Sequence, residues 1–226
     1  LTLKLDETKA IIETSERTRR IVQVGTQSRH VPGYAVLAKR LHEGLIGNLL
    51  YGWAQTFRSD WRKLYPNPEE DSRRNWRMKQ SEGGSVVYEM GVHTIDVFNW
   101  FINSNPVEVS CLGGVHNTRL QKRDSWDHAG LTVRYANGAV MTYGGNLYAC
   151  GGPGPDVLFG DISSLQIPAR SARGATVFKR PYWRPFGEGS GKVEQQAIEL
   201  PQGEADPSFL QYGHFLEAVQ GKRPPF

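Results

Sequence analysis

The sequence predicts an α+β fold, in which an open, mostly antiparallel β-sheet carries its helices on one face and is preceded by a helix–strand pair. Three observations lead to this prediction. Helix-like apolar patterns are concentrated before residue 102, and strand-like runs dominate after residue 106. Asn137-Gly138 separates two alternating runs, which is a strong β-hairpin signal. Helices and strands that are segregated along a chain pack as separate layers.

The first predicted elements are a helix and a short strand. Residues 6–19 have a helical pattern, with Asp6 as a candidate N-cap and cations near the end. The β-branched run at 21–25 ends in glycine and is typical of a buried parallel strand. A single helix–strand pair cannot fold alone, so we expect it to belong to a larger sheet.

Three further elements and one long loop are predicted before residue 106. Pro32-Gly33 begins a helix that runs to about Leu45, and residues 49–58 form a strand. Residues 59–82 are polar and rich in Arg and Trp, which predicts an irregular and functional loop. A strong helix pattern then spans 85–101.

The second half of the chain predicts strands and one helix. The strand-like segments are 107–115, 129–135, 139–146, 176–179 and 193–200. Residues 150–174 and 181–191 are rich in Gly, Pro, Ser and Arg and are predicted to be loops, and 207–219 is predicted to be a helix.

Composition excludes several classes of protein. The 226 residues carry a net charge of +4, but cations and anions are interspersed, which is unlike a nucleic-acid-binding surface. Cys111 and Cys150 have no metal-like spacing, so we expect neither a zinc site nor a disulfide framework, and a reducing, cytoplasmic compartment. The apolar runs are shorter than the roughly 20 residues of a membrane helix, so no membrane partner is expected.

The helix predicted at 85–101 carries the candidate chemistry. At 100° per residue, its polar and aromatic residues Glu89, His93, Asp96 and Trp100 share one face. A carboxylate one turn before a histidine can orient the ring and raise its pKa, as a general base requires. Gly91 would permit close approach of a backbone or ligand. Two alternatives stay open: an inert histidine paired with Glu89, and a metal site, for which no second His-rich segment is present.

The Arg- and Trp-rich loop is a candidate sugar-binding wall. Aromatic rings stack on sugar C–H surfaces, and guanidinium groups bind hydroxyl or carboxylate oxygens. The side chains concerned are Arg58, Trp61, Arg62, Tyr65, Arg73, Arg74, Trp76 and Arg77. Interleaved cations and aromatic rings could also bind single-stranded nucleic acid, but the acidic run 69–71 argues against this. A packed surface loop remains the third interpretation.

Other polar segments carry weaker signals. Trp126-Asp127-His128 could reach the site from a strand end. The simpler interpretation is that Asp127 and His128 pair with each other at the surface. The segment 151–155 lacks the Lys and Ser/Thr of a phosphate-binding loop. The remaining histidines have no chemical neighbours in sequence and are predicted to be structural or exposed: His30, His42, His116 and His214.

The motifs together resemble one enzyme family. Gly83-Gly84 followed by Glu89-x₃-His93-x₂-Asp96 is similar to the Gly-Gly-x₄-Asp-x₃-His-x₂-Asp signature of the glucose–fructose oxidoreductase/inositol dehydrogenase/MocA (Gfo/Idh/MocA) family. The segment 22–32 resembles the last strand of that family's Rossmann domain and the entry to its substrate domain. The segment 41–48 resembles its Gly-x-Ile-Gly turn, and the Asn-Gly hairpin also matches, so the likeness covers nearly the whole chain.

The resemblance implies a role for each candidate residue. His93 would be the catalytic acid/base, and Glu89, which stands where the family commonly has Asp, would bind substrate or orient His93. Gln27 would contact the nicotinamide of NAD or NADP. Arg29 would lie near the sugar. With Arg58, Trp76 and Arg77 of the Arg/Trp loop and Asp96 of the helix, it makes up the predicted substrate-binding set. No metal is implied.

The resemblance also implies a division of the chain. Residues 1–28 would be the C-terminal remnant of a dinucleotide-binding domain, and 29–226 a substrate-binding and oligomerisation domain. The family's glycine-rich fingerprint and its catalytic lysine would precede Leu1, and a closing helix would follow Phe226, so we expect this chain alone to be inactive. A homo-oligomer formed through the open sheet is also implied.

We therefore predict an NAD(P)-dependent oxidoreductase that acts on a sugar, polyol or sugar derivative by hydride transfer. Two alternatives remain at this stage: a sugar-active hydrolase or lyase that uses His93 and Glu89, and a non-catalytic carbohydrate-binding or assembly module that uses the Arg/Trp loop.

Overall fold

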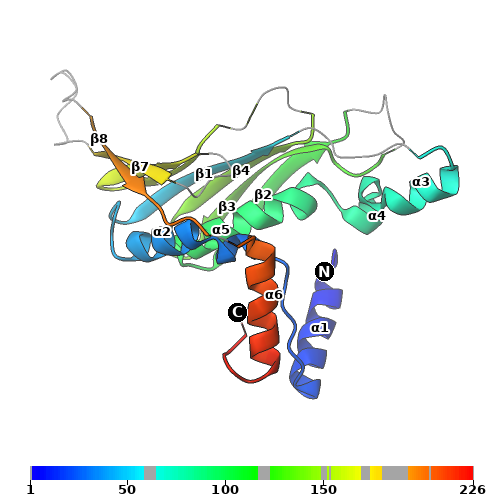
Figure 1. Cartoon of the computed structure of the whole chain (residues 1–226). Helices are drawn as coiled ribbons and strands as arrows, with labels where there is room; N and C mark the ends of the chain where they lie inside the picture. Colours follow the sequence, from blue (N-terminus) through cyan, green and yellow to red (C-terminus); the bar gives the residue numbers. More distant parts are fainter. Residues whose placement is uncertain are drawn as a thin grey trace.

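The computed structural model describes residues 2–58, 65–116, 123–148, 152, 154–168, 174–179, 193–203 and 205–225. These residues form one eight-stranded sheet with the order β2-β3-β4-β1-β5-β6-β7-β8, and the long helices beside it lie on one face (Figure 1). The strands are β1 (Leu49–Phe57), β2 (Pro106–Gly114), β3 (His128–Tyr135), β4 (Val140–Asn146), β5 (Asp156–Gly160), β6 (Ser163–Ile167), β7 (Gly174–Lys179) and β8 (Glu194–Glu199).

The sheet is mostly antiparallel, as predicted. Only β1 and β4 pair in parallel, with Ala54 opposite Tyr143 at the centre of the register. All other neighbouring strands in the described sheet pair antiparallel. The hairpin from β3 to β4 turns at Asn137-Gly138, where Gly138 has a φ of 88°. This left-handed conformation is what an Asn-Gly turn supplies at little cost.

The core lies between the sheet and two helices, α2 (Pro32–His42) and α5 (Val92–Ile102). Alternate residues of β1, β3 and β4 are buried against this layer, so these strands bury one face against the helices and leave the other open. The helices approach β1 closely because Gly52 has no side chain. A Cβ atom there would lie 2.8 Å from the ring of Phe98.

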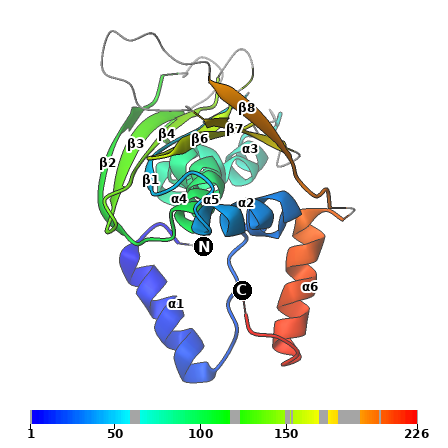
Figure 2. The same ribbon diagram turned by 90° about the vertical axis from the view of Figure 1, so that its left-hand side faces the viewer.

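Two helices project away from the sheet: α1 (Leu5–Thr18) and α6 (Pro207–Val219) (Figure 2). No residue of α1, which the structure describes in full, is buried. The α6 helix begins at Asp206, whose carboxylate accepts from the backbone N–H of Ser208. Its Gln211 side chain donates to the carbonyl of Val24, and that of Gln23 donates back to the carbonyl of Gln211. Segments nearly two hundred residues apart therefore pack together.

Most predicted elements are confirmed, but three predictions are wrong. Residues 21–25 do not form a strand, because no described segment pairs with them. The predicted loop 150–174 contains the antiparallel pair β5 and β6. The predicted loop 59–82 contains three short helices: α3 (Pro68–Arg74), the 3₁₀ turn η2 (Trp76–Met78) and α4 (Gln80–Gly83). The predicted loop 181–191 lies outside the described residues. Across the described part of the chain, no helix has both the length and the apolar character needed to cross a membrane.

The first of the short helices shows why the composition was misleading. Asn67 caps α3, since its side-chain oxygen accepts from the N–H groups of Glu69 and Glu70. Pro68 occupies the first helical turn, where its missing N–H costs nothing. Polar and Pro-containing sequences thus form a capped helix of seven residues here.

Candidate functional site

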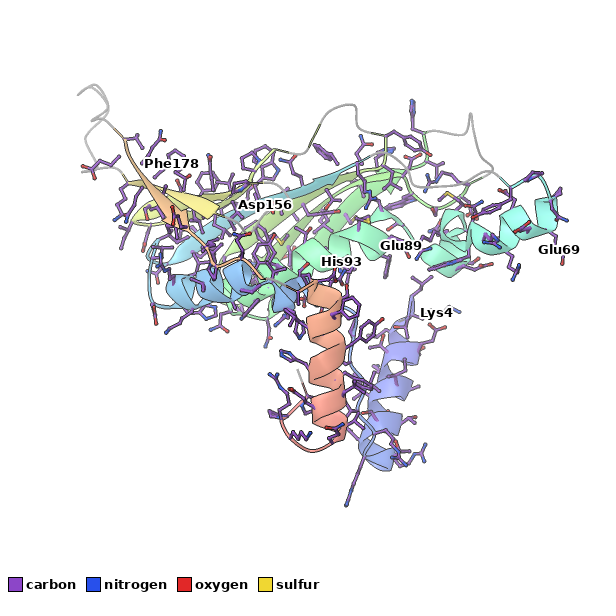
Figure 3. All side chains as sticks on the ribbon, viewed as in Figure 1. Lys4, Glu69, Glu89, His93, Asp156 and Phe178 are labelled. Atoms are coloured by element: carbon purple, nitrogen blue, oxygen red, sulfur yellow. The ribbon has the colours of Figure 1, made fainter. Side chains whose placement is uncertain are left out.

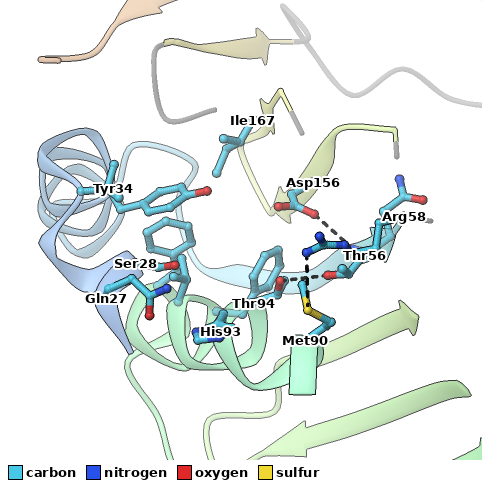
Figure 4. A pocket seen from close by; sticks show the side chains of 15 residues that line it. Gln27, Ser28, Tyr34, Thr56, Arg58, Met90, His93, Thr94, Asp156 and Ile167 are labelled. Carbon is cyan, nitrogen blue, oxygen red and sulfur yellow. Dashed lines mark hydrogen bonds between the residues drawn. The ribbon is translucent and has the colours of Figure 1, made fainter. Parts of the chain in front are cut away.

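A cavity of about 340 Å³ lies between the helical layer and the sheet (Figure 4). This volume lies within the range of about 300–1,000 Å³ that is usual for small-molecule sites. Its lining comes from the segment before α2, from α2, from α5 and the turn before it, and from the strands β1, β5 and β6. The lining residues are Gln27, Ser28, Val31, Tyr34, Gln55, Thr56, Arg58, Met90, His93, Thr94, Val97, Phe98, Phe101, Asp156 and Ile167.

His93 lines this cavity from the first turn of α5. Its Nδ1 is buried and has no hydrogen-bond partner among the described residues. Burial lowers the pKa of His93, and this outweighs the nearby carboxylates of Asp96 and Glu89, which act to raise it. The two acids thus act on this pKa in the expected direction, but the net shift is downward because burial has the larger effect. A neutral imidazole at pH 7 is, however, the form that accepts a proton.

The turn that precedes α5 is π-helical and spans η3 (Val87–Gly91). A π-turn inserts an extra residue into the helix and rotates the residues before it relative to those after it. Glu89 consequently does not hydrogen-bond His93 and does not line the cavity. Its Oε2 accepts instead from Nε of Arg77 at 2.6 Å, and the Arg77 guanidinium lies 4.3 Å from the ring centroid of Trp76.

Arg29 and Asp96 form a second ion pair. Nε and Nη2 of Arg29 donate to the two carboxylate oxygens of Asp96 at 2.7 and 2.9 Å. The same guanidinium lies 5.5 Å from the ring centroid of Trp100. This bidentate contact joins α5 to η1 (Gln27–His30). It gives both residues a structural role, and neither lines the cavity.

The glycines of the predicted signature serve close packing. A Cβ atom on Gly83 would lie 2.6 Å from Cα of Arg77, so this glycine allows Arg77 to approach the start of the helix. Gly91 was predicted to admit a backbone or ligand. It admits a side chain, because a Cβ atom there would lie 3.0 Å from the ring of Tyr143.

The structure brings only some of the predicted site residues together. His93, Gln27 and Arg58 line one cavity. Glu89 instead forms a separate group with Arg77 and Trp76, and Figure 3 shows Glu89 and His93 at different points along the helical segment. The loop residues Trp61 and Arg62 lie outside the described residues. Tyr65 packs against the guanidinium of Arg74, with 5.0 Å between the guanidinium carbon and the ring centroid. Arg73 is exposed on α3.

Sequence reasoning missed Asp156 and Tyr34. Burial raises the pKa of Asp156 to about 7, although the backbone N–H of Gln55, which donates to Oδ1 at 3.2 Å, partly offsets this. Burial and the nearby Asp156 carboxylate raise the pKa of Tyr34 to about 12. Asp156 is an isolated acid that follows a Gly- and Pro-rich run and precedes three apolar residues. That pattern could have indicated a strand whose first residue is polar.

The weaker candidates lie elsewhere. Asp127 is buried, and its carboxylate oxygens contact Nδ1 of His128 at 2.7 Å and the backbone N–H of His116 at 3.0 Å. His30 and His214 are 4.5 Å apart between ring centroids, at the contact of η1 with α6. No group of three or more His, Cys, Asp or Glu side chains within the described ranges is arranged to hold a metal ion.

A helix-covered mixed sheet with a cavity between its layers, lined by His93, defines an α+β domain with a candidate ligand site. Residues 34–175 match the model of the GFO/IDH/MocA C-terminal domain, which is more than half of the chain. The chain therefore belongs to the Gfo/Idh/MocA family.

Two relatives and one solved structure illustrate the similarity. An uncharacterized oxidoreductase of Synechocystis is 22% identical over the whole chain, which spans 63% of that protein. The scyllo-inositol 2-dehydrogenase (NAD(+)) of Bacillus subtilis is 26% identical over 62% of the chain and 37% of its own length. A levoglucosan dehydrogenase solved with NADH and levoglucosan superposes with a TM-score of 0.73 at 17% identity, over 96% of this chain and 61% of that one. The chain thus spans less than two thirds of these relatives.

Proposed function

We propose that this chain is the substrate-binding part of an NAD(P)-dependent oxidoreductase that acts on a sugar, polyol or sugar derivative, with His93 as the acid/base. The observation that carries the proposal is the buried Nδ1 of His93, which has no hydrogen-bond partner in the described chain and belongs to a ring that lines the cavity. An unsatisfied buried polar atom beside a cavity is costly unless a ligand uses the site. The names of the relatives, an inositol dehydrogenase and a levoglucosan dehydrogenase, support the substrate class.

The cavity suits a polyhydroxylated ring. Tyr34, Phe98 and Phe101 give it an aromatic side, and aromatic faces pack against the C–H surfaces of sugars. Hydroxyl-binding groups are interspersed among them, including Thr56 and Thr94, whose side-chain oxygens are 3.4 Å apart. A ring held here would lie beside His93.

The proton transfer follows from the state of His93. Oxidation of a secondary alcohol removes a hydride from carbon and a proton from oxygen, and the bound nicotinamide supplies the hydride acceptor. The neutral imidazole of His93 accepts the hydroxyl proton, and the same group returns it in the reverse direction. Burial keeps the imidazole unprotonated near neutral pH.

We further propose that residues 1–28 belong to a dinucleotide-binding domain and 29–226 to the substrate domain. Apolar side chains on α1, on α6 and on the segment between α1 and η1 are exposed, which is typical of a surface that another part of a protein covers. They are Leu5, Ile12, Val22, Val24, Phe209, Tyr212, Leu216 and Val219. Since α6 packs on the segment around Val24, it would adjoin the proposed dinucleotide-binding domain although its residues belong to 29–226.

Gln27 fits the proposed contact with the cofactor. It lines both the cavity of His93 and a second cavity of about 470 Å³ between the segment 23–27 and α6. The primary amide of Gln27 can both donate a hydrogen bond to the carboxamide of a nicotinamide ring and accept one from it. The remaining dinucleotide contacts would come from residues outside this chain.

The other predicted binding residues would act at the edges of the site. Arg58 would bind a hydroxyl group directly, because it lines the cavity. Trp76, Arg77 and Glu89 would shape the neighbouring loop, and Arg29 with Asp96 would hold α5 in place. The open face of the sheet exposes Trp53 and Phe159, which supports the proposed homo-oligomer through this face.

The test is the replacement of His93 in the whole protein. His93→Ala should lower kcat by about 10²–10⁴-fold, the contribution of a general acid/base. NAD(P)H formation would be followed with scyllo-inositol and levoglucosan. His42→Ala is the matched control, because His42 is exposed on α2 and bonds the carbonyl of Trp100.

Three outcomes separate the functions. Loss of turnover in His93→Ala alone supports the proposal. Unchanged turnover in His93→Ala rejects the acid/base role. Product formed from sugar without any nicotinamide would instead identify a hydrolase or lyase.

A further inference from the structure

Asp156 stands on the sheet side of the cavity, across from the helical wall that carries His93 (Figure 4). It is the first residue of β5, whose pairing with β6 places it opposite Ile167. Leu158, two residues on, faces the helical layer beside Gly52 and Phe98. Because side chains alternate along a strand, Asp156 faces that layer too. The register of β5 therefore directs its carboxyl group into the cavity.

The carboxyl group has hydrogen-bonding capacity to spare. An ionised carboxylate can accept about four hydrogen bonds. Within the described residues, the hydrogen bond to Asp156 is the one from the backbone N–H of Gln55 to Oδ1, at 3.2 Å. The second oxygen, Oδ2, is left for a donor that enters the cavity.

The position is costly for the folded chain. Asp156 is partly buried, and this burial disfavours its ionised form. A group that costs stability and lines a cavity beside a candidate catalytic residue is a candidate for function. The hydroxyl group of a sugar or polyol is the donor that the rest of the cavity wall suits.

We propose that Asp156 is a substrate-binding residue that accepts a hydrogen bond from a substrate hydroxyl group and thereby selects among stereoisomers. This rests on the function proposed above. A ligand that spans the cavity has one hydroxyl group at His93 and another at Asp156. Substrates in which the second hydroxyl group is missing or inverted leave the carboxylate without its partner.

The test compares ligands and variants in the whole protein. scyllo-Inositol, levoglucosan and a mono-deoxy analogue for each of their hydroxyl positions would be titrated calorimetrically into wild type, Asp156→Asn and Asp156→Ala, with the nicotinamide cofactor at saturation. Asp156→Ala should weaken binding about ten- to a hundredfold, the usual effect of losing a hydrogen bond to a charged group. Asp156→Asn keeps an acceptor oxygen and should lose less. Glu199→Gln, an exposed acid on β8, is the control.

The decisive comparison is a double cycle between residue and hydroxyl group. In wild type, one deoxy analogue should bind at least about tenfold more weakly than its parent, and in Asp156→Ala the two should bind equally. If every analogue keeps its wild-type ratio in Asp156→Ala, or if none of these polyols binds wild type, the proposal is overturned.

Turnover separates this inference from the proposed function. A large loss in His93→Ala together with unchanged KM in Asp156→Ala would reject the role of Asp156 and leave the oxidoreductase in place. Weakened binding in Asp156→Ala with full turnover in His93→Ala would support the role of Asp156 and reject His93 as the acid/base. A fall in kcat at unchanged KM in Asp156→Asn would show proton transfer by Asp156 and also overturn the binding role.

Discussion

Asp156 and His93 line the same cavity from different layers of the fold, Asp156 from the sheet and His93 from α5. Burial acts on both side chains and disfavours the charged form of each: it raises the pKa of Asp156 to about 7 and lowers the pKa of His93. Both groups are therefore shifted toward their neutral forms, and Asp156 changes charge near pH 7. Four testable consequences follow from the geometry of this site and its supports.

The pH dependence of stability should report the burial of Asp156. The unfolded carboxyl group ionises near its ordinary value of 3.8, and the folded one near 7. The folded state therefore holds the extra proton, so the free energy of unfolding falls as the pH rises from about 4 to about 7. Asp156→Asn removes this loss. The free energy of unfolding of the variant should therefore exceed that of wild type by up to about 4 kcal/mol at pH 8 and by almost nothing at pH 4.

Urea unfolding at the two pH values measures this difference. Glu199→Gln, at an exposed acid, should change stability equally at both. An Asp156→Asn variant no more stable than wild type at pH 8 would mean that the carboxyl group is not enclosed.

The pH profile of kcat/KM should contain two groups from the cavity. Ionised Asp156 accepts the substrate hydroxyl, and neutral His93 accepts the proton, so both favour activity as the pH rises. The wild-type rate should thus rise through about pH 7, and in Asp156→Asn the rise should move below pH 6.5, where the lowered pKa of His93 lies. The other ionisable groups that face the cavity are Tyr34 and Arg58.

Steady-state rates between pH 5 and 9 would show this shift. A profile that is identical in wild type and Asp156→Asn would exclude ionisation of Asp156 from the binding step. If the residual kcat/KM of His93→Gln still rises with pH below 6.5, a group other than His93 causes that rise.

Gly91→Ala should destabilise the protein by about 1–2 kcal/mol. The new Cβ atom would lie 3.0–3.2 Å from the ring and hydroxyl of Tyr143, which is wholly buried and cannot move aside. Gly213→Ala is the matched control in α6, where nothing lies within 4 Å of the new atom. That change should stabilise the helix by up to about 1 kcal/mol. Thermal unfolding compares the two, and equal behaviour would contradict the packing argument.

The contact of Arg77 with Glu89 should be a modest interaction. The pair is partly exposed, so a double-mutant cycle with Arg77→Ala and Glu89→Ala should give a coupling free energy of about 0.5–1 kcal/mol in unfolding. Lys79 and Glu82, an exposed pair nearby, provide the comparison and should couple less. A coupling near zero in both pairs would show that Arg77 does not hold Glu89.

Some features of this protein were determined by its sequence alone. The helix at Pro207–Val219, the β3–β4 hairpin and the strand Leu49–Phe57 depend on local signals: apolar periodicity, Asn-Gly turn chemistry and β-branched or aromatic runs. These signals act over a few residues, so they can be read from the sequence before any tertiary contact is known. The motif around His93 also lies on a helix that lines the cavity.

Only the tertiary structure decided which side chains meet. The strand expected at 21–25 needs neighbours that the described chain does not offer, whereas Asp156–Gly160, which follows a Gly- and Pro-rich run, becomes a strand because β1 and β6 pair with it. The π-turn rotates Glu89 toward Arg77 and away from His93. Strand pairing and helix rotation depend on contacts between residues far apart in sequence, and for that reason the cavity shared by His93 and Asp156 could not be predicted from local pattern.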